Sequence, residues 1–200
     1  MKAAFIDVET TGLDPQRHSL WSLALRIYDA KDGLLDSFEF KCRPLPDADI
    51  DREALRVGAV TFEQLQAYEH SKDALSGLRS VLERHVRPRD RQDKLYFIGY
   101  NAPFDAEFVR AFFDRQGDKY FGSWFWHPPI CVMNLAAAVC ALTETRVELP
   151  NFKLHTVARH FNLIVDEERL HDAIYDIEIT QALYERCMNG PWEFGKIPGV

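Results

Sequence analysis

The sequence lacks an apolar run long enough to span a membrane, and its N-terminus lacks the apolar stretch of a signal peptide. Its four cysteines, Cys42, Cys131, Cys140 and Cys187, include no CxxC pair, and no cluster of His and Cys has zinc-finger spacing. These absences exclude a zinc-finger domain and argue against a disulfide framework. We therefore expect a cytoplasmic protein with reduced, mostly buried thiols.

An excess of positive charge is also lacking, since the formal net charge is −7 and the pI is near 5.5. This balance excludes a protein that coats nucleic acid through a broad basic surface. It does not exclude local binding of a short strand, provided that cations occupy an acidic site.

The chain has the size and composition of one globular domain, with 200 residues of which 46% are hydrophobic and 12% aromatic. We expect the domain to cover residues 1–188. Residues 189–200 lack hydrophobic periodicity and are expected to form a C-terminal tail.

Hydrophobic patterns predict strands first and then alternating strands and helices, which is typical of a mixed sheet with helices packed on its faces. Thr61 and Ser71 are candidate helix N-caps, and Pro103 is expected to open a helix. The expected strands are 3–8, 20–29, 34–43 and 95–101, and the longer expected helices are 72–87, 133–143, 153–161 and 172–188, besides the helix after Pro103.

Two acids, Asp7 and Glu9, follow the apolar run of the first strand. Alternate residues of a strand share a face, so the two carboxylates emerge together, with Cα atoms roughly 6.5–7 Å apart. Carboxylates held this close repel one another unless a cation lies between them. The alternatives are a metal site and a simple strand exit into solvent.

Three further residues could join this site. Asp105 is expected in the first turn of a helix, where an acid also stabilises the helix dipole. Asp176 falls on the apolar arc of its helix, so it needs a metal or an ion-pair partner. Asp172 is a natural N-cap of that helix, and His171 precedes it, where a histidine is either incidental or catalytic. Four carboxylates with hard oxygen donors suit Mg²⁺ or Mn²⁺ better than zinc.

Three segments resemble the exonuclease motifs of the DnaQ-like, or DEDDh, 3′→5′ exonucleases: "FIDVETTGL" (5–13), "GYNAPFDAEFV" (99–109) and "HDAIYD" (171–176). They occur in order and span nearly the whole chain. The resemblance implies a ribonuclease H-like α/β fold, with a five-stranded mixed sheet flanked by helices on both faces.

The resemblance also implies roles for five residues. Asp7, Glu9, Asp105 and Asp176 would bind two divalent cations, Mg²⁺ or Mn²⁺, and His171 would be the general base. Two such ions about 3.5–4 Å apart can activate water and neutralise a leaving 3′ oxygen. The expected reaction is removal of nucleoside 5′-monophosphates from the 3′ end of single-stranded nucleic acid, with DNA favoured over RNA.

Substrate contacts are expected from Thr10, Thr11, Leu13 and Phe104, although core packing is an equal alternative for Phe104. The aromatic loop 119–129 is interpreted as buried or covered by a partner rather than as a stacking surface. The basic run at 84–94 is interpreted as a solvated loop.

Three alternatives are weighed at this point: an exoribonuclease of the same family that trims RNA, a catalytically inactive nucleic-acid-binding or polymerase-docking module, and a non-nuclease acidic protein whose motifs arise by chance. Proofreading would require a separate polymerase as partner, since these residues contain no polymerase module. The sequence leaves the oligomeric state undetermined.

Overall fold

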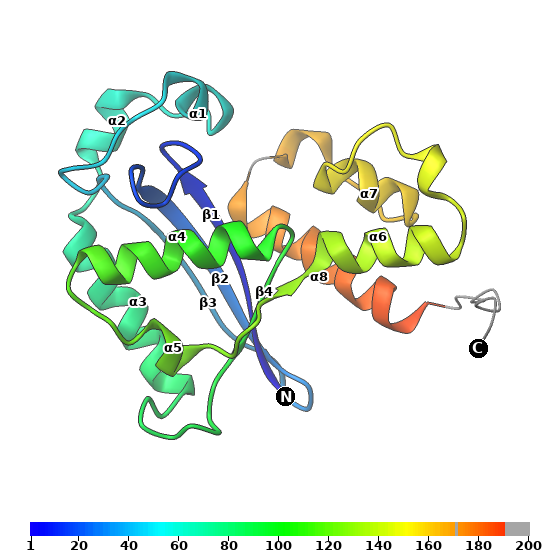
Figure 1. The fold of residues 1–200 in the computed structure, drawn as a ribbon, viewed down its shortest axis with the longest axis horizontal. Helices are drawn as coiled ribbons and strands as arrows, with labels where there is room; N and C mark the ends of the chain where they lie inside the picture. The colour runs from blue at the N-terminus through cyan, green and yellow to red at the C-terminus, as the bar shows by residue number, and fades with distance from the viewer. Residues whose placement is uncertain (171, 191–200) are drawn as a thin grey trace.

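The computed structural model describes residues 1–170 and 172–190. Five strands form one sheet in the order β3-β2-β1-β4-β5 (Figure 1). β1 pairs antiparallel with β2, and β2 with β3, whereas β1–β4 and β4–β5 are parallel. The expected five-stranded mixed sheet is confirmed. The strands are β1 (Lys2–Thr10), β2 (Leu20–Asp29), β3 (Gly33–Lys41), β4 (Tyr96–Gly99) and β5 (Ile130–Cys131).

Helices cover both faces of the sheet, as predicted. Ala4, Ile6 and Val8 of β1 share one hydrophobic core with α3, α4 and α5, whereas Ala3 and Phe5 share a second core with α6, α7 and α8. The helices are α1 (Arg52–Val57), α2 (Phe62–Ala67), α3 (Ser71–His85), α4 (Ala102–Arg115), α5 (Phe121–Trp124), α6 (Val132–Leu142), α7 (Leu154–His160) and α8 (Ala173–Asn189), with short 3₁₀ turns at η1 (Arg146–Glu148) and η2 (Glu167–Arg169).

Local signals placed most helix starts correctly. Thr61 caps α2 with a full capping box, and Asp172 caps α8 by accepting a hydrogen bond from the Tyr175 N–H at 2.9 Å. Ser71 is a different case, because it is the first residue of α3 and His70 occupies the cap position without a side-chain hydrogen bond. The prediction of Ser71 as an N-cap is therefore wrong.

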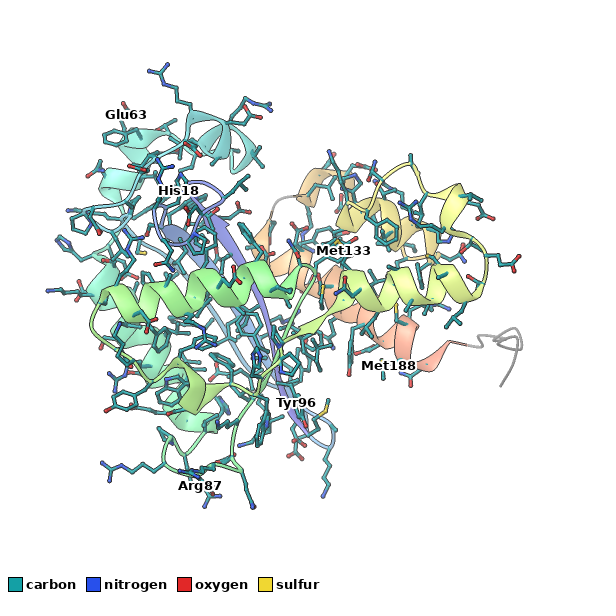
Figure 2. The ribbon with its side chains drawn as sticks, viewed as in Figure 1. His18, Glu63, Arg87, Tyr96, Met133 and Met188 are labelled. Carbon is teal, nitrogen blue, oxygen red and sulfur yellow. The ribbon has the colours of Figure 1, made fainter. Side chains whose placement is uncertain are left out.

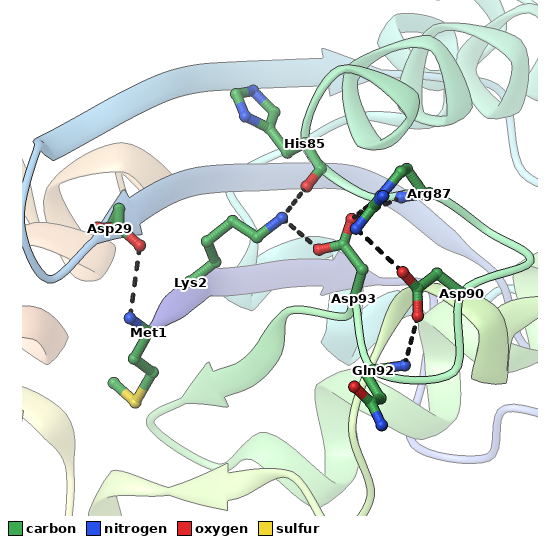
Figure 3. A network of polar contacts seen from close by, with 8 residues as sticks. All are labelled: Met1, Lys2, Asp29, His85, Arg87, Asp90, Gln92 and Asp93. Carbon is green, nitrogen blue, oxygen red and sulfur yellow. Dashed lines mark hydrogen bonds and ion pairs between the residues drawn. The ribbon is translucent and has the colours of Figure 1, made fainter.

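Polar contacts tie the start of β1 to the loop before β4 (Figure 3). Lys2 Nζ donates to Asp93 Oδ1 at 2.5 Å and to the His85 carbonyl, and Arg87 contacts both Asp90 and Asp93. Arg84 and Arg87 of the basic run thus form ion pairs within the fold, and Arg89 and Arg91 are exposed, in agreement with the interpretation of this run as solvated, although Arg84 belongs to the last turn of α3.

All four cysteines are free and buried, as expected from their spacing. In the described part of the chain, none of the helices combines the length and the apolar character that a membrane crossing requires. Residues 191–200, which make up most of the predicted tail, lie outside the described residues.

Candidate active site

The carboxyl end of β1 brings Asp7 and Glu9 to the α8 side of the sheet. Both residues alternate with Ala3 and Phe5, which belong to the core shared with α8. Their partners on β2 are Ala24 and Ser22, two small residues that leave room above the strand. β1 is the central strand of the sheet, so its end is surrounded by neighbouring elements.

Asp105 reaches the same strand end from α4. Pro103 and Asp105 both lie in the first turn of α4, as predicted, and Asp105 has 4% of its surface exposed. Its Oδ1 accepts a hydrogen bond from the Val8 N–H at 3.3 Å. Gly99 permits this approach, because a Cβ there would lie 3.0 Å from the Ile6 carbonyl oxygen and 3.1 Å from Asp105 Oδ2.

Asp176 completes the group from the first turn of α8. Its neighbours Ala173 and Ile177 are buried in the core, so the N-terminal turn of α8 is fixed against the sheet. The charge of Asp176 raises the pKa of both Asp7 and Glu9, which shows that the three carboxyls lie within electrostatic reach. His171, the predicted general base, lies outside the described residues.

The four acids repel one another in the absence of cations. Burial, followed by the charges of Asp105, Glu9 and Asp176, raises the pKa of Asp7 well above its ordinary value of 3.8. Burial and Asp176 raise the pKa of Glu9 to about 7, against a lowering effect of Lys41. Burial likewise raises the pKa of Asp105 to about 7, despite its hydrogen bond from Val8. A positive ion would relieve this repulsion.

A preformed cage of three or more His, Cys, Asp or Glu ligands is absent from the described residues. Mg²⁺ does not require such a cage, because it keeps several waters and uses one or two carboxylates together with substrate phosphates. The donor set of Asp7, Glu9, Asp105 and Asp176 consists of hard carboxylate oxygen atoms held close together. The residues present therefore fit a hydrated divalent cation of the magnesium type.

A groove of about 480 Å³ opens beside Glu9, between β1 and α1. Thr10, Leu13 and Phe104 line it, and Leu13 is 82% exposed. Phe104 also packs against Phe108, with ring centroids 4.8 Å apart, so it belongs partly to the core and partly to the groove wall. The structure thus bears out the core-packing alternative in part, and base stacking by Phe104 stays a prediction.

The loop after β1 is held rigid from inside. Thr11 is fully buried, and its hydroxyl donates to the Asp49 carbonyl at 2.7 Å and accepts from the Ser19 N–H. The ring of His18 packs against Gly12, where a Cβ would lie 2.2 Å from the ring, and Figure 2 shows His18 near the tip of β1. Thr11 therefore stands apart from the other predicted contacts: its side chain supports the loop and does not line the groove.

Sequence analysis did not identify α1 as part of the site. Arg52, Ala54 and Val57 of α1 line the groove, and Gly58, just after α1, lies beside Glu9. α1 is only six residues long and buries none of its side chains, so it carries no periodic apolar signal.

The aromatic loop has mixed exposure. Phe121, Trp124 and Phe125 are buried, in agreement with the interpretation as an inward-facing loop, whereas Tyr120 is 69% exposed. Trp126 is partly exposed and lines a second cavity, of about 530 Å³, between α4 and the segment before β5.

Comparisons with known proteins agree with this architecture. The family model RNase_T, described as "Exonuclease", matches residues 4–184. Ribonuclease T of Haemophilus influenzae (strain KW20) is 26% identical over 98% of this chain and 82% of that protein, and Ribonuclease T of Wigglesworthia glossinidia brevipalpis is 27% identical over 96% and 88%.

Among solved structures, E. coli exonuclease I in complex with a dT13 oligonucleotide has a TM-score of 0.72 at 21% identity. It is matched over 92% of this chain, which spans about two fifths (41%) of that exonuclease I chain. This likeness shows the ribonuclease H-like fold. Because the family model covers nearly the whole chain, the protein belongs to the RNase_T exonuclease family and is a hydrolase of phosphodiester bonds.

Proposed function

We propose that this protein removes nucleotides one at a time from the 3′ end of single-stranded nucleic acid and releases nucleoside 5′-monophosphates. The observation that carries the proposal is the group of carboxyls at the end of β1, in which Asp7, Glu9 and Asp105 all have raised pKa values. An exposed cluster of acids would not be perturbed in this way, and perturbed groups beside a groove are typical of reaction sites.

The residues that would hold two divalent cations are Asp7, Glu9, Asp105 and Asp176. Such ions, when bound, supply charge neutralisation and an activated water for phosphodiester hydrolysis. The chain's own contribution is positional. The hydrogen bond that Asp105 accepts from the Val8 N–H fixes the α4 carboxyl against β1, and the buried neighbours of Asp176 fix α8. His171 is proposed as the group that takes a proton from the attacking water.

The groove beside Glu9 is proposed to receive the 3′-terminal nucleotide. Phe104 offers a ring face for stacking on a base, and the exposed Leu13 offers an apolar contact on the same wall. Thr10, next to Glu9 in the chain, also lines the groove, and its hydroxyl donates to the Gly12 carbonyl at 2.7 Å. Together these residues would align the last phosphodiester bond with the acids.

The substrate class has two candidates, and each is supported by a comparison. The solved neighbour holds a DNA oligonucleotide, which supports single-stranded DNA, the candidate that we favour. The curated relatives that match 98% and 96% of the chain are named Ribonuclease T, which supports trimming of RNA. A pocket distinguishes the two through contacts to the 2′-hydroxyl.

The test is digestion of matched single-stranded DNA and RNA oligonucleotides, labelled at the 5′ end, with Mg²⁺, with Mn²⁺ and with a chelator. We expect a ladder that shortens from the 3′ end, no reaction with the chelator, and loss of about 10²-fold or more in kcat for Asp7→Asn and His171→Ala. Asp32→Asn, in the exposed turn between β2 and β3, is the matched control. Internal cleavage, or full activity of Asp7→Asn, would contradict the proposal.

A further inference from the structure

Lys41 lies at the same end of the sheet as the carboxyl end of β1, where the acids are, and two strands away from Glu9. β1 and β3 are both antiparallel to β2, so they run in the same direction. Lys41, the last residue of β3, therefore lies at the end of the sheet where β1 also ends. In the sheet register Glu9 pairs with Ser22, and Ser22 pairs with Lys41. Paired residues share a face, and strands lie about 4.8 Å apart, so the two Cα atoms are roughly 10 Å apart.

The residue between Glu9 and Lys41 in this row is a small one. Ser22 in the middle is small and 1% exposed, and its hydroxyl has no hydrogen-bond partner among the described residues. The Lys41 side chain is 49% exposed, and its ion-pair contact with Glu39 Oε1 is long, at 3.6 Å. The charge of Lys41 also acts on Glu9, whose pKa it lowers.

Lys41 differs from Arg26, another cation on this face. Arg26 of β2 donates to Glu178 Oε1 at 2.9 Å, so its charge is already matched by an acid of α8. Lys41 is held only loosely by Glu39, so an incoming anion can compete for it. The cations proposed at the carboxylates would serve the scissile phosphate, so a separate exchangeable cation nearby is available for a neighbouring phosphate of the same strand.

The Phe104 wall of the groove and Lys41 lie on opposite faces of the sheet. Phe104 packs against the core that Val8 shares with α4, whereas the sheet register places Lys41 on the face of Glu9 and α8. A strand whose last nucleotide stacks on Phe104 and whose last phosphodiester bond meets the acids would continue across the end of β1 onto the face of Lys41. We propose that Lys41 binds the phosphate on the 5′ side of the scissile one. This inference rests on the proposed function.

The test compares a dinucleotide, which has one phosphodiester bond, with a trinucleotide, which has two. For the wild-type protein we expect the second phosphate to lower KM about tenfold, the effect of one charge-assisted contact. Lys41→Gln should hydrolyse the dinucleotide within about twofold of wild type and lose most of the trinucleotide advantage. Lys41→Arg should retain it, and Glu39→Gln, which frees Lys41, should strengthen it.

A second measurement separates phosphate binding from a structural role. The logarithm of kcat/KM for a longer oligonucleotide falls with the logarithm of salt concentration, and removing one phosphate contact should reduce that slope by about 0.7. Lys31→Gln, an exposed lysine at the opposite end of the same hairpin, should leave the slope unchanged. Equal effects of Lys41→Gln on both substrates, or an unchanged slope, would overturn the inference. If the wild-type protein degrades neither substrate, the proposed function fails instead.

Discussion

Replacing Asp105 with Asn should stabilise the metal-free protein while it abolishes activity. The pKa of Asp105 rises from 3.8 to about 7 in the folded protein. Between these two pKa values the folded state holds a proton that the unfolded state has lost. The folded state is therefore not penalised by this group below pH 3.8, and its free energy of unfolding falls as pH rises from 3.8 toward 7. Each pKa unit corresponds to about 1.4 kcal/mol, so at pH 8 the ionised Asp105 lowers the free energy of unfolding by up to about 4 kcal/mol.

Asn keeps the geometry and removes the charge. Its side-chain oxygen can still accept the hydrogen bond from the Val8 N–H, so the expected gain is electrostatic. Neighbouring carboxyls share the repulsion, so we expect Asp105→Asn to raise the free energy of unfolding by about 1–4 kcal/mol at pH 8 and by close to zero at pH 4. In a protein of this size each kcal/mol corresponds to about 2–4 °C in Tm.

The assay is thermal or urea unfolding in the presence of a chelator between pH 4 and pH 8. Glu107→Gln, which removes an exposed carboxylate on the same helix, is the control and should show no such pH-dependent gain. Adding Mg²⁺ should then raise the Tm of the wild-type protein more than that of the variant, because the ion relieves the same repulsion. A variant that is less stable than wild type at pH 8, or a difference independent of pH, would refute the electrostatic explanation.

Three other substitutions test the site and its support. Phe104→Ala should lower kcat/KM about tenfold or more by removing one stacked base, with Phe62→Ala on α2 as an exposed control, and an unchanged KM would exclude stacking. Gly99→Ala should lower the free energy of unfolding by about 1–3 kcal/mol, and with it Tm, because the new Cβ would lie 3.0 Å from the Ile6 carbonyl oxygen. The variant should also have a lower kcat, because Asp105 would be displaced. A wild-type Tm and kcat would show that α4 can shift freely. Asp93→Asn should lower stability by about 1–2 kcal/mol at pH 7, because hydrogen bonds, chiefly from Lys2, lower the pKa of Asp93 to about 2, and this difference should vanish as pH falls toward 2. A constant difference across pH would mean that lost packing, not charge, explains the effect.

The sequence by itself determined the elements that carry the acids. The apolar run before Asp7 specifies a buried strand, Pro103 specifies the start of a helix, and Asp172 caps α8 by a contact within its own first turn. These signals are local, because a strand alternates over two residues and a cap bonds three residues ahead. For the same reason they could name Asp105 and Asp176 as candidates without placing them beside Asp7.

Only the tertiary structure decided how the site is built around those acids. α1 lines the groove without burying any residue, Thr11 turns inward to bond Asp49, and Lys41 lies in one row with Glu9, two strands away. Each of these contacts joins residues distant along the chain, and no local periodicity encodes them. The raised pKa values have the same origin, since desolvation and like charges act only after separate strands and helices have packed together.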